Sequence, residues 1–347
     1  MLGSIRISEA YWHMSSKLNI GVLGCANIAG KAILPAIKKL SSHYNLVGVS
    51  SRTKKKADEF ANTFSTKSYY EYEDLLSNKD LDAIYIPLPN SLHREWVEKA
   101  LCRGLHVLVE KSMACNLEDV ITLNQMATDK NLLLMENFQF RFHPQLEVIK
   151  KLLDSGEIGA LRSVKSTFAF PPFSTTDNIR YNAALGGGAL LDAGAYPLKI
   201  LQVFLGSGIK VLAATSHFDA SKCVDLWGSA FLGSDDDSVG AHMNFGFDNY
   251  YQCEIELVGS LGRIFTDRIF TAPATHAAKI ELYKTHSGRR TINLEPSNHF
   301  ENILVDFKEK IVQNKGFAGE YRQNLNQARL ISEFRERAGL LNLTKAI

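Results

Sequence analysis

KLNIGVLGCANIA, residues 17 to 29, joins a short apolar run to a glycine turn and to the start of an amphipathic stretch. A strand that ends in such a turn and leads into a helix is typical of the first βαβ unit of a dinucleotide-binding domain. The three small positions of that fingerprint fall on Gly24, Ala26 and Ala29. The motif alone is also compatible with a doubly wound domain that binds no nucleotide. The surrounding sequence distinguishes the two possibilities.

The segment from Lys17 to Asn137 alternates short apolar runs with amphipathic stretches of helical length. The runs are NIGVLG, NLVGVS, DAIYIPL, HVLVE and NLLLMEN. This rhythm predicts a parallel sheet with crossover helices, which is a doubly wound arrangement.

The pattern changes after Pro144. A helix is expected at 143–154, a half-buried strand in LRSVKSTFAF and a second helix at 188–205. Alternating runs then predict a largely antiparallel open sheet, and two helical stretches close the chain. The runs lie near 210–217, 224–232, 239–247, 251–258 and 279–285, and the helices at 298–313 and 320–338.

The predicted fold class is therefore α/β with two domains. Residues 17–140 are expected to form a dinucleotide-binding Rossmann domain. Residues 141–347 form an α/β domain with a large open, mainly antiparallel sheet for substrate binding and oligomerisation. Residues 1–16 are an extension, of which 1–13 are expected to contribute nothing to function.

Composition excludes several classes of function. The chain has 347 residues, 45% of them hydrophobic and 22% charged, with a net charge of +2, as in ordinary globular proteins of two domains. The sequence has no cluster of basic residues typical of nucleic-acid binding. Its five cysteines are scattered and do not have the spacing of metal ligands. No apolar run approaches the roughly 18 residues of a membrane span. Without a secretory signal, a cytoplasmic location is expected.

The end of the second predicted strand points to the cofactor. An NAD enzyme places an acidic residue there for the ribose 2′-hydroxyl, whereas this chain has SSRTKKK at 50–56. Ser51, Arg52 and Lys56 can bind a 2′-phosphate, which favours NADP(H) over NAD(H). The lysines can also be read as the solvated start of a helix.

Two longer stretches resemble a known family. IYIPLPNSLHREWVEKALCRGLHVLVEKS (84–112) and GGGALLDAGAYPLKIL (186–201) are similar to signatures of the glucose-fructose oxidoreductase, inositol dehydrogenase and rhizopine-catabolism (Gfo/Idh/MocA) family. The resemblance implies substrate bound between a nicotinamide and the second sheet. It also implies reversible hydride transfer at a carbinol carbon of a sugar or polyol.

The resemblance places the catalytic lysine on Lys111 and pairs Asp192 with Tyr196, which are spaced i, i+4 on one helical face. Tyr196 can donate a proton to the carbonyl oxygen that hydride transfer makes negative. A free phenol has a pKa of about 10, and a nearby Lys111 ammonium would stabilise its anion. Asp192 is expected to orient this pair. Taken without the family, Tyr196 fits a core tyrosine and Lys111 a surface charge.

Other candidates are less specific. Arg180 is either an anion contact for substrate or a surface arginine, His93 is either a site residue or a packing residue, and Glu110 is expected to anchor its loop. The family has proline where this chain has Ser112, so the peptide before Ser112 is left open between trans and cis. The full set of expected cofactor residues is Gly24, Ala26, Asn27, Ile28, Ser51, Arg52, Lys56, Leu88, Asn90, His93, Glu110, Lys111 and Asn137.

The function expected from these observations is an NADP(H)-dependent ketoreductase of a keto-sugar. With tyrosine at position 196, the chain resembles the branch of the family that contains nucleotide-sugar 3-ketoreductases and dihydrodiol dehydrogenases. A nucleotide-linked 3-keto-deoxysugar is therefore the favoured substrate. The alternatives are a sugar or trans-dihydrodiol dehydrogenase working oxidatively, and a non-catalytic protein that senses NADP(H) or a sugar. A homodimer or homotetramer is expected, because an exposed apolar sheet face is usually covered.

Overall fold

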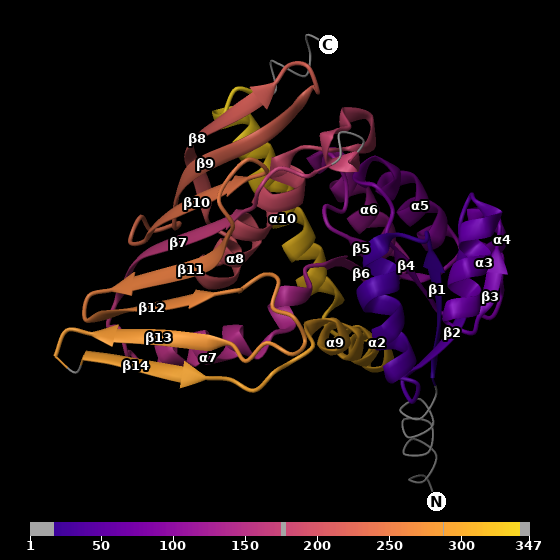
Figure 1. The fold of residues 1–347 in the computed structure, drawn as a ribbon, viewed down its shortest axis with the longest axis horizontal. Helices are drawn as coiled ribbons and strands as arrows, with labels where there is room; N and C mark the ends of the chain where they lie inside the picture. Colours follow the sequence, from indigo (N-terminus) through magenta and orange to yellow (C-terminus); the bar gives the residue numbers. More distant parts are fainter. Residues whose placement is uncertain (1–16, 175–177, 287, 341–347) are drawn as a thin grey trace, which may run out of the picture.

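Two sheets organise the chain in the computed structural model, which describes residues 17–174, 178–286 and 288–340 (Figure 1). The expected extension, residues 1–16, and its 1–13 segment lie outside the described residues. The N-terminal sheet lies beside its helices on one side of the molecule, and the larger sheet fills the other side.

The first sheet has six parallel strands in the order β3-β2-β1-β4-β5-β6. The chain reverses its direction of winding between β1 and β4, which is where such sheets bind ligands at their carboxyl ends. Five strands were predicted, and β3 was missed because it has only three residues. The strands are β1 Leu18–Leu23, β2 Tyr44–Ser50, β3 Lys67–Tyr69, β4 Ala83–Ile86, β5 His106–Glu110 and β6 Leu134–Asn137.

Helices cover both faces of this sheet, so its central strands are apolar throughout. Ile20 and Leu23 of β1 are fully buried and belong to two different core clusters. The helix α6 begins where the Asn116 side chain accepts a hydrogen bond from the Asp119 amide. The helical elements are η1 Ala29–Ile33, α2 Leu34–Lys39, α3 Lys54–Thr63, α4 Tyr72–Leu76, α5 Asn90–Cys102 and α6 Leu117–Asp129.

Within the described residues, the second sheet has eight strands in the order β14-β13-β12-β11-β7-β10-β9-β8, and only β7 and β10 pair in parallel. The mainly antiparallel open sheet is thus confirmed. The sequence missed β12 and β14. The glycines Gly259 and Gly262 flank the turn that leads into β12, so its first residues read as a loop. The strands are β7 Leu161–Ala169, β8 Lys210–Asp219, β9 Val224–Gly233, β10 Gly240–Gly246, β11 Gln252–Gly259, β12 Gly262–Asp267, β13 Lys279–Lys284 and β14 Gly288–Asn293.

One face of the second sheet packs on helices α8 and α10, where the rings of Phe245 and Phe334 lie 5.3 Å apart. On β8 and β9, Leu212, Trp227 and Phe231 remain exposed. The helical elements are η2 Gln139–Phe142, α7 Pro144–Asp154, η3 Ile179–Tyr181, η4 Ala183–Leu185, η5 Leu190–Gly194, α8 Ala195–Leu205, α9 His299–Gln313 and α10 Phe317–Arg337.

Helix α10 joins the two sheets (Figure 1). Asn324 donates a hydrogen bond to the Leu134 carbonyl of β6, at 3.0 Å. One turn further, Gln327 donates to the Ala195 carbonyl at the start of α8, at 2.8 Å. The helix that carries Tyr196 is therefore held in a defined position relative to the first sheet.

Candidate active site

A cleft of about 1010 Å³ lies between the carboxyl ends of the first sheet and the second sheet. It brings together most residues that the sequence singled out, from six separate segments. The predicted residues that line it are Gly24, Ala26, Asn27, Ile28, Ser51, Arg52, Lys56, Leu88, Asn90, Glu110, Lys111, Arg180, Asp192 and Tyr196.

The fingerprint loop forms one wall of the cleft. Gly24 has φ of +124°, and a Cβ atom there would lie 2.7 Å from the Leu88 side chain, so only glycine fits. Ala26 replaces the second glycine and still lines the open cleft. Ile28 precedes η1 without a side-chain cap, which leaves backbone N–H groups at this end suited to a pyrophosphate.

The far end of the cleft carries positive charge. Ser51, Arg52 and Lys56 line it, and among the described residues the only acidic ones in the lining are Glu110 and Asp192, at the other end. Tyr72 also lines this end and was missed, because nothing in its spacing marks it. Burial raises the pKa of the Tyr72 phenol, whereas the neighbouring Arg52, which hydrogen-bonds its hydroxyl, lowers it. These residues fit a 2′-phosphate.

Asp192 lies at the centre of a three-residue ionic network. Lys111 Nζ donates to its Oδ1 and Arg180 Nε to its Oδ2, both at 2.6 Å. Burial raises the pKa of this carboxyl, but the two cations outweigh it and hold the pKa at about 2. Asp192 is thus ionised at neutral pH and has no proton to donate, which agrees with an orienting role.

This network predicts a pH dependence of stability. Since the pKa of Asp192 is lower in the folded than in the unfolded chain, its carboxylate stabilises the fold above pH 4 and loses that effect as the pH falls toward 2. Between pH 6 and pH 3, the stability advantage of the native chain over Asp192→Asn should fall by about 1 kcal/mol.

Urea unfolding at the two pH values measures this difference. Asp248→Asn, at an exposed loop position, makes the same chemical change elsewhere and serves as the control. An equal pH dependence in both variants would contradict the assignment.

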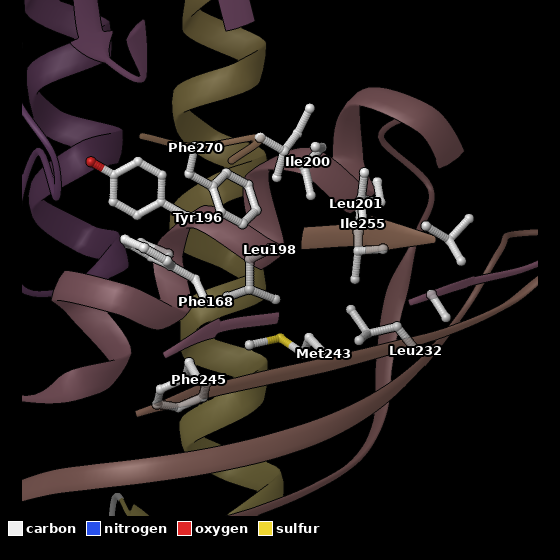
Figure 2. Packing of buried hydrophobic residues seen from close by; sticks show 14 of the residues in the cluster. Phe168, Tyr196, Leu198, Ile200, Leu201, Leu232, Met243, Phe245, Ile255 and Phe270 are labelled. Carbon is white, nitrogen blue, oxygen red and sulfur yellow. The ribbon is translucent and has the colours of Figure 1, made fainter. Parts of the chain in front are cut away.

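Tyr196 is enclosed by aromatic side chains and is 8% exposed. Its ring lies 5.0 to 5.9 Å from those of Phe138, Phe140, Phe168 and Phe270. Figure 2 shows the hydroxyl directed away from the labelled aliphatic residues of the cluster.

The pKa of Tyr196 departs from the expected direction. Burial raises it, followed by the negative charges of Glu110 and Asp192, while a hydrogen bond from Gln139 lowers it. The sequence analysis expected Lys111 to stabilise the phenolate. That expectation is not met here: Lys111 Nζ lies 5.1 Å from the ring centroid and its charge is bound by Asp192.

Two predicted cofactor residues do not line the cleft. His93 is fully buried, with its ring nitrogens 2.8 Å from the carbonyl oxygens of Leu88 and Ser112, and burial lowers its pKa to about 4. Asn137 is also fully buried. Its amide donates to Glu110. Their contribution is to hold the loops whose residues do line the cleft.

Glu110 is anchored as expected, because Tyr85 donates a hydrogen bond to it at 2.6 Å and Asn137 a second. Burial raises the pKa of its carboxyl. The peptide between Lys111 and Ser112 is cis, which answers the question that the missing proline left open.

The wall of the cleft that the second sheet forms is aromatic, and the sequence analysis did not predict most of its residues. Phe168, Phe170, Pro171 and Phe173 come from the end of β7, where FAFPPF was a visible but unused signal. The Arg180 guanidinium lies 4.8 Å from the centre of the Phe173 ring. Aromatic rings and a guanidinium group therefore contact each other in this wall of the cleft.

Within the described residues, no helix is both long and apolar enough to cross a membrane. The same residues hold no group of three or more histidine, cysteine, aspartate or glutamate side chains suited to a metal ion.

Comparisons with known proteins agree with this geometry. Residues 18–138 match an oxidoreductase family with an NAD-binding Rossmann fold, and residues 146–265 match a Gfo/Idh/MocA C-terminal domain. A dTDP-3,4-didehydro-2,6-dideoxy-alpha-D-glucose 3-reductase from Saccharopolyspora spinosa is 44% identical over 78% of this chain and 80% of the relative. A second 3-reductase of the same name, from Streptomyces violaceoruber, is 37% identical over 94% of this chain and 97% of the relative.

A solved structure is similar over almost its whole length. It is a 3-ketoreductase from Actinomadura kijaniata in complex with NADP and TDP-benzene, with a TM-score of 0.88 and 33% identity. The match covers 92% of this chain and 98% of that one.

Proposed function

The chain belongs to the Gfo/Idh/MocA family of NAD(P)-dependent oxidoreductases, and on that premise we propose that it is an NADPH-dependent ketoreductase of a nucleotide-linked 3-keto-deoxysugar. The observation that carries the proposal is the single cleft that joins a basic end at Ser51 and Arg52 to Lys111, Asp192 and Tyr196 at the other end. The relatives named as dTDP-sugar 3-reductases support the substrate class.

The chain's own residues perform the acid chemistry of this proposal. NADPH supplies the hydride when it is bound. As negative charge develops on the substrate oxygen, Tyr196 donates its phenolic proton, which its raised pKa keeps in place at neutral pH. Lys111, held by Asp192, provides positive charge beside the same oxygen. The aromatic ring cluster excludes water from the reacting groups.

Arg180 and the aromatic wall suit the nucleotide part of the substrate. The Arg180 side chain is 37% exposed and divides its contacts between Asp192 and the face of Phe173. A guanidinium in that position can bind a diphosphate, and the neighbouring rings can stack on a base.

A turnover assay tests the function directly. We expect the purified chain to oxidise NADPH, followed at 340 nm, when dTDP-3,4-didehydro-2,6-dideoxy-α-D-glucose is added. Tight NADPH binding without reduction of this or any other keto-sugar would favour a non-catalytic sensor. NADP⁺ reduction by a free sugar or a dihydrodiol, with no keto-sugar reduction, would favour an oxidative dehydrogenase.

The cofactor assignment predicts a change in selectivity. Arg52→Asp should weaken NADPH binding by about 10- to 100-fold, because it removes a charged contact to the 2′-phosphate and adds a repelling carboxylate. NADH, which has no 2′-phosphate, should bind about as before. Fluorescence titration with both cofactors measures this.

The exposed Lys55 offers a matched control, since Lys55→Asp changes the charge equally outside the cleft. If Arg52→Asp weakened both cofactors to the same extent, the 2′-phosphate site would be misplaced.

We also propose that the chain forms a homodimer or homotetramer, in which a second copy covers the exposed Leu212, Trp227 and Phe231 of the open sheet. Light scattering measures the mass in solution, and a monomer at micromolar concentration would refute it.

A further inference from the structure

A second cavity of about 400 Å³ lies among helices α7, α8 and α10 and the short helix η2 (Figure 1 locates α7, α8 and α10). It shares no lining residue with the active-site cleft. Nothing in the proposed reaction uses it.

The walls of this cavity are cationic. Arg141, Lys150 and Arg322 line it, and no aspartate or glutamate among the described residues does. Arg141 is paired with the buried Glu320, through two contacts of 3.0 Å. In the part of the chain that the structure describes, neither Lys150 nor Arg322 forms an ion pair. Both residues are exposed, so the surface of the cavity carries two solvated positive charges without an ion-pair partner, which would attract an anion.

A buried amide in the wall lacks an acceptor. Gln202 is 7% exposed, and its Oε1 accepts a hydrogen bond from Lys199 Nζ at 3.4 Å. Its Nε2 is buried and has no hydrogen-bond partner. Buried donors are nearly always paired in folded proteins, so Gln202, which lines the cavity, has an unfilled donor position beside it. Gln323 and Asn326 add two further amides to the same cavity.

We propose that this cavity is a binding site for a phosphate monoester of a small polar alcohol, such as a sugar phosphate. Arginine and lysine together suit a phosphate dianion, and the amides of Gln202 and Asn326 suit hydroxyl groups. The volume exceeds what a bare phosphate ion needs, which favours an ester over the free ion.

Calorimetry tests the site. Glucose 1-phosphate is titrated into the full chain saturated with NADP⁺, so that the basic end of the cleft is occupied. One molecule should bind per chain, inorganic phosphate should bind more weakly, and glucose or chloride at equal ionic strength should not bind. No binding of glucose 1-phosphate at millimolar concentration would overturn the proposal. Because calorimetry measures binding and not turnover, the result does not depend on the proposed reaction.

Variants locate the binding. Arg322→Glu should weaken it at least about tenfold, and Gln202→Leu should weaken it too. Arg337→Glu makes the same charge change on α10 outside the cavity and should leave it unchanged, as should Arg180→Gln in the cleft. Equal losses in Arg322→Glu and Arg337→Glu, or loss in Arg180→Gln, would overturn the assignment.

Discussion

Replacing Tyr196 by phenylalanine should lower the turnover of keto-sugar reduction by about 10²- to 10⁴-fold, the usual contribution of a positioned acid. The ring packs against four phenylalanines, so its shape is kept and the fold and the cofactor affinity should be retained. Single-turnover kinetics with NADPH measure the effect on the chemical step.

The pH profile gives an independent check on Tyr196. Burial raises its pKa above the ordinary value of about 10, and only the protonated phenol can donate. Reduction by the native chain should therefore not decline through ionisation of Tyr196 below pH 10. Tyr250→Phe, at an 88% exposed position, is the control for the chemical change. Near-normal turnover of Tyr196→Phe would mean that another group or a water molecule delivers the proton.

Lys111→Met should lower turnover by about 10²-fold or more, because it removes the positive charge that the proposed function assigns to the reacting oxygen. The Lys111 side chain is 10% exposed and is held by both a carboxylate and a carbonyl oxygen of Asp192, so its charge is fixed in place. Lys99→Met, on the exposed surface of α5, is the matched control.

The double variant of Lys111 and Tyr196 tests whether the two residues act together. Residues that serve one proton transfer are not additive, so the double variant should lose little more than the worse single variant. Losses that multiply would indicate two independent contributions. Loss of NADPH affinity equal to the loss of turnover in Lys111→Met would instead assign the lysine to cofactor binding alone.

Local patterns in the sequence determined a large part of this molecule. Continuous apolar runs between amphipathic stretches predicted the first sheet, and runs of period two predicted the second, because these patterns follow from backbone geometry and burial. The same reasoning missed β3 and β12, whose shortness or flanking glycines hide the period. Gly24 and Arg52 could be singled out because the roles proposed for them depend on their place at a strand end, which the chain order gives directly.

Tertiary structure decided the electrostatics of the site. Asp192 meets Lys111, 81 residues away, as well as Arg180, and this pairing sets its low pKa. Tyr196 has a raised pKa because rings from separate segments bury it, while the lysine expected to lower it is bound elsewhere. Sequence identifies which groups can ionise. Their pKa values depend on burial and on neighbouring charges, and only the folded chain brings those within reach.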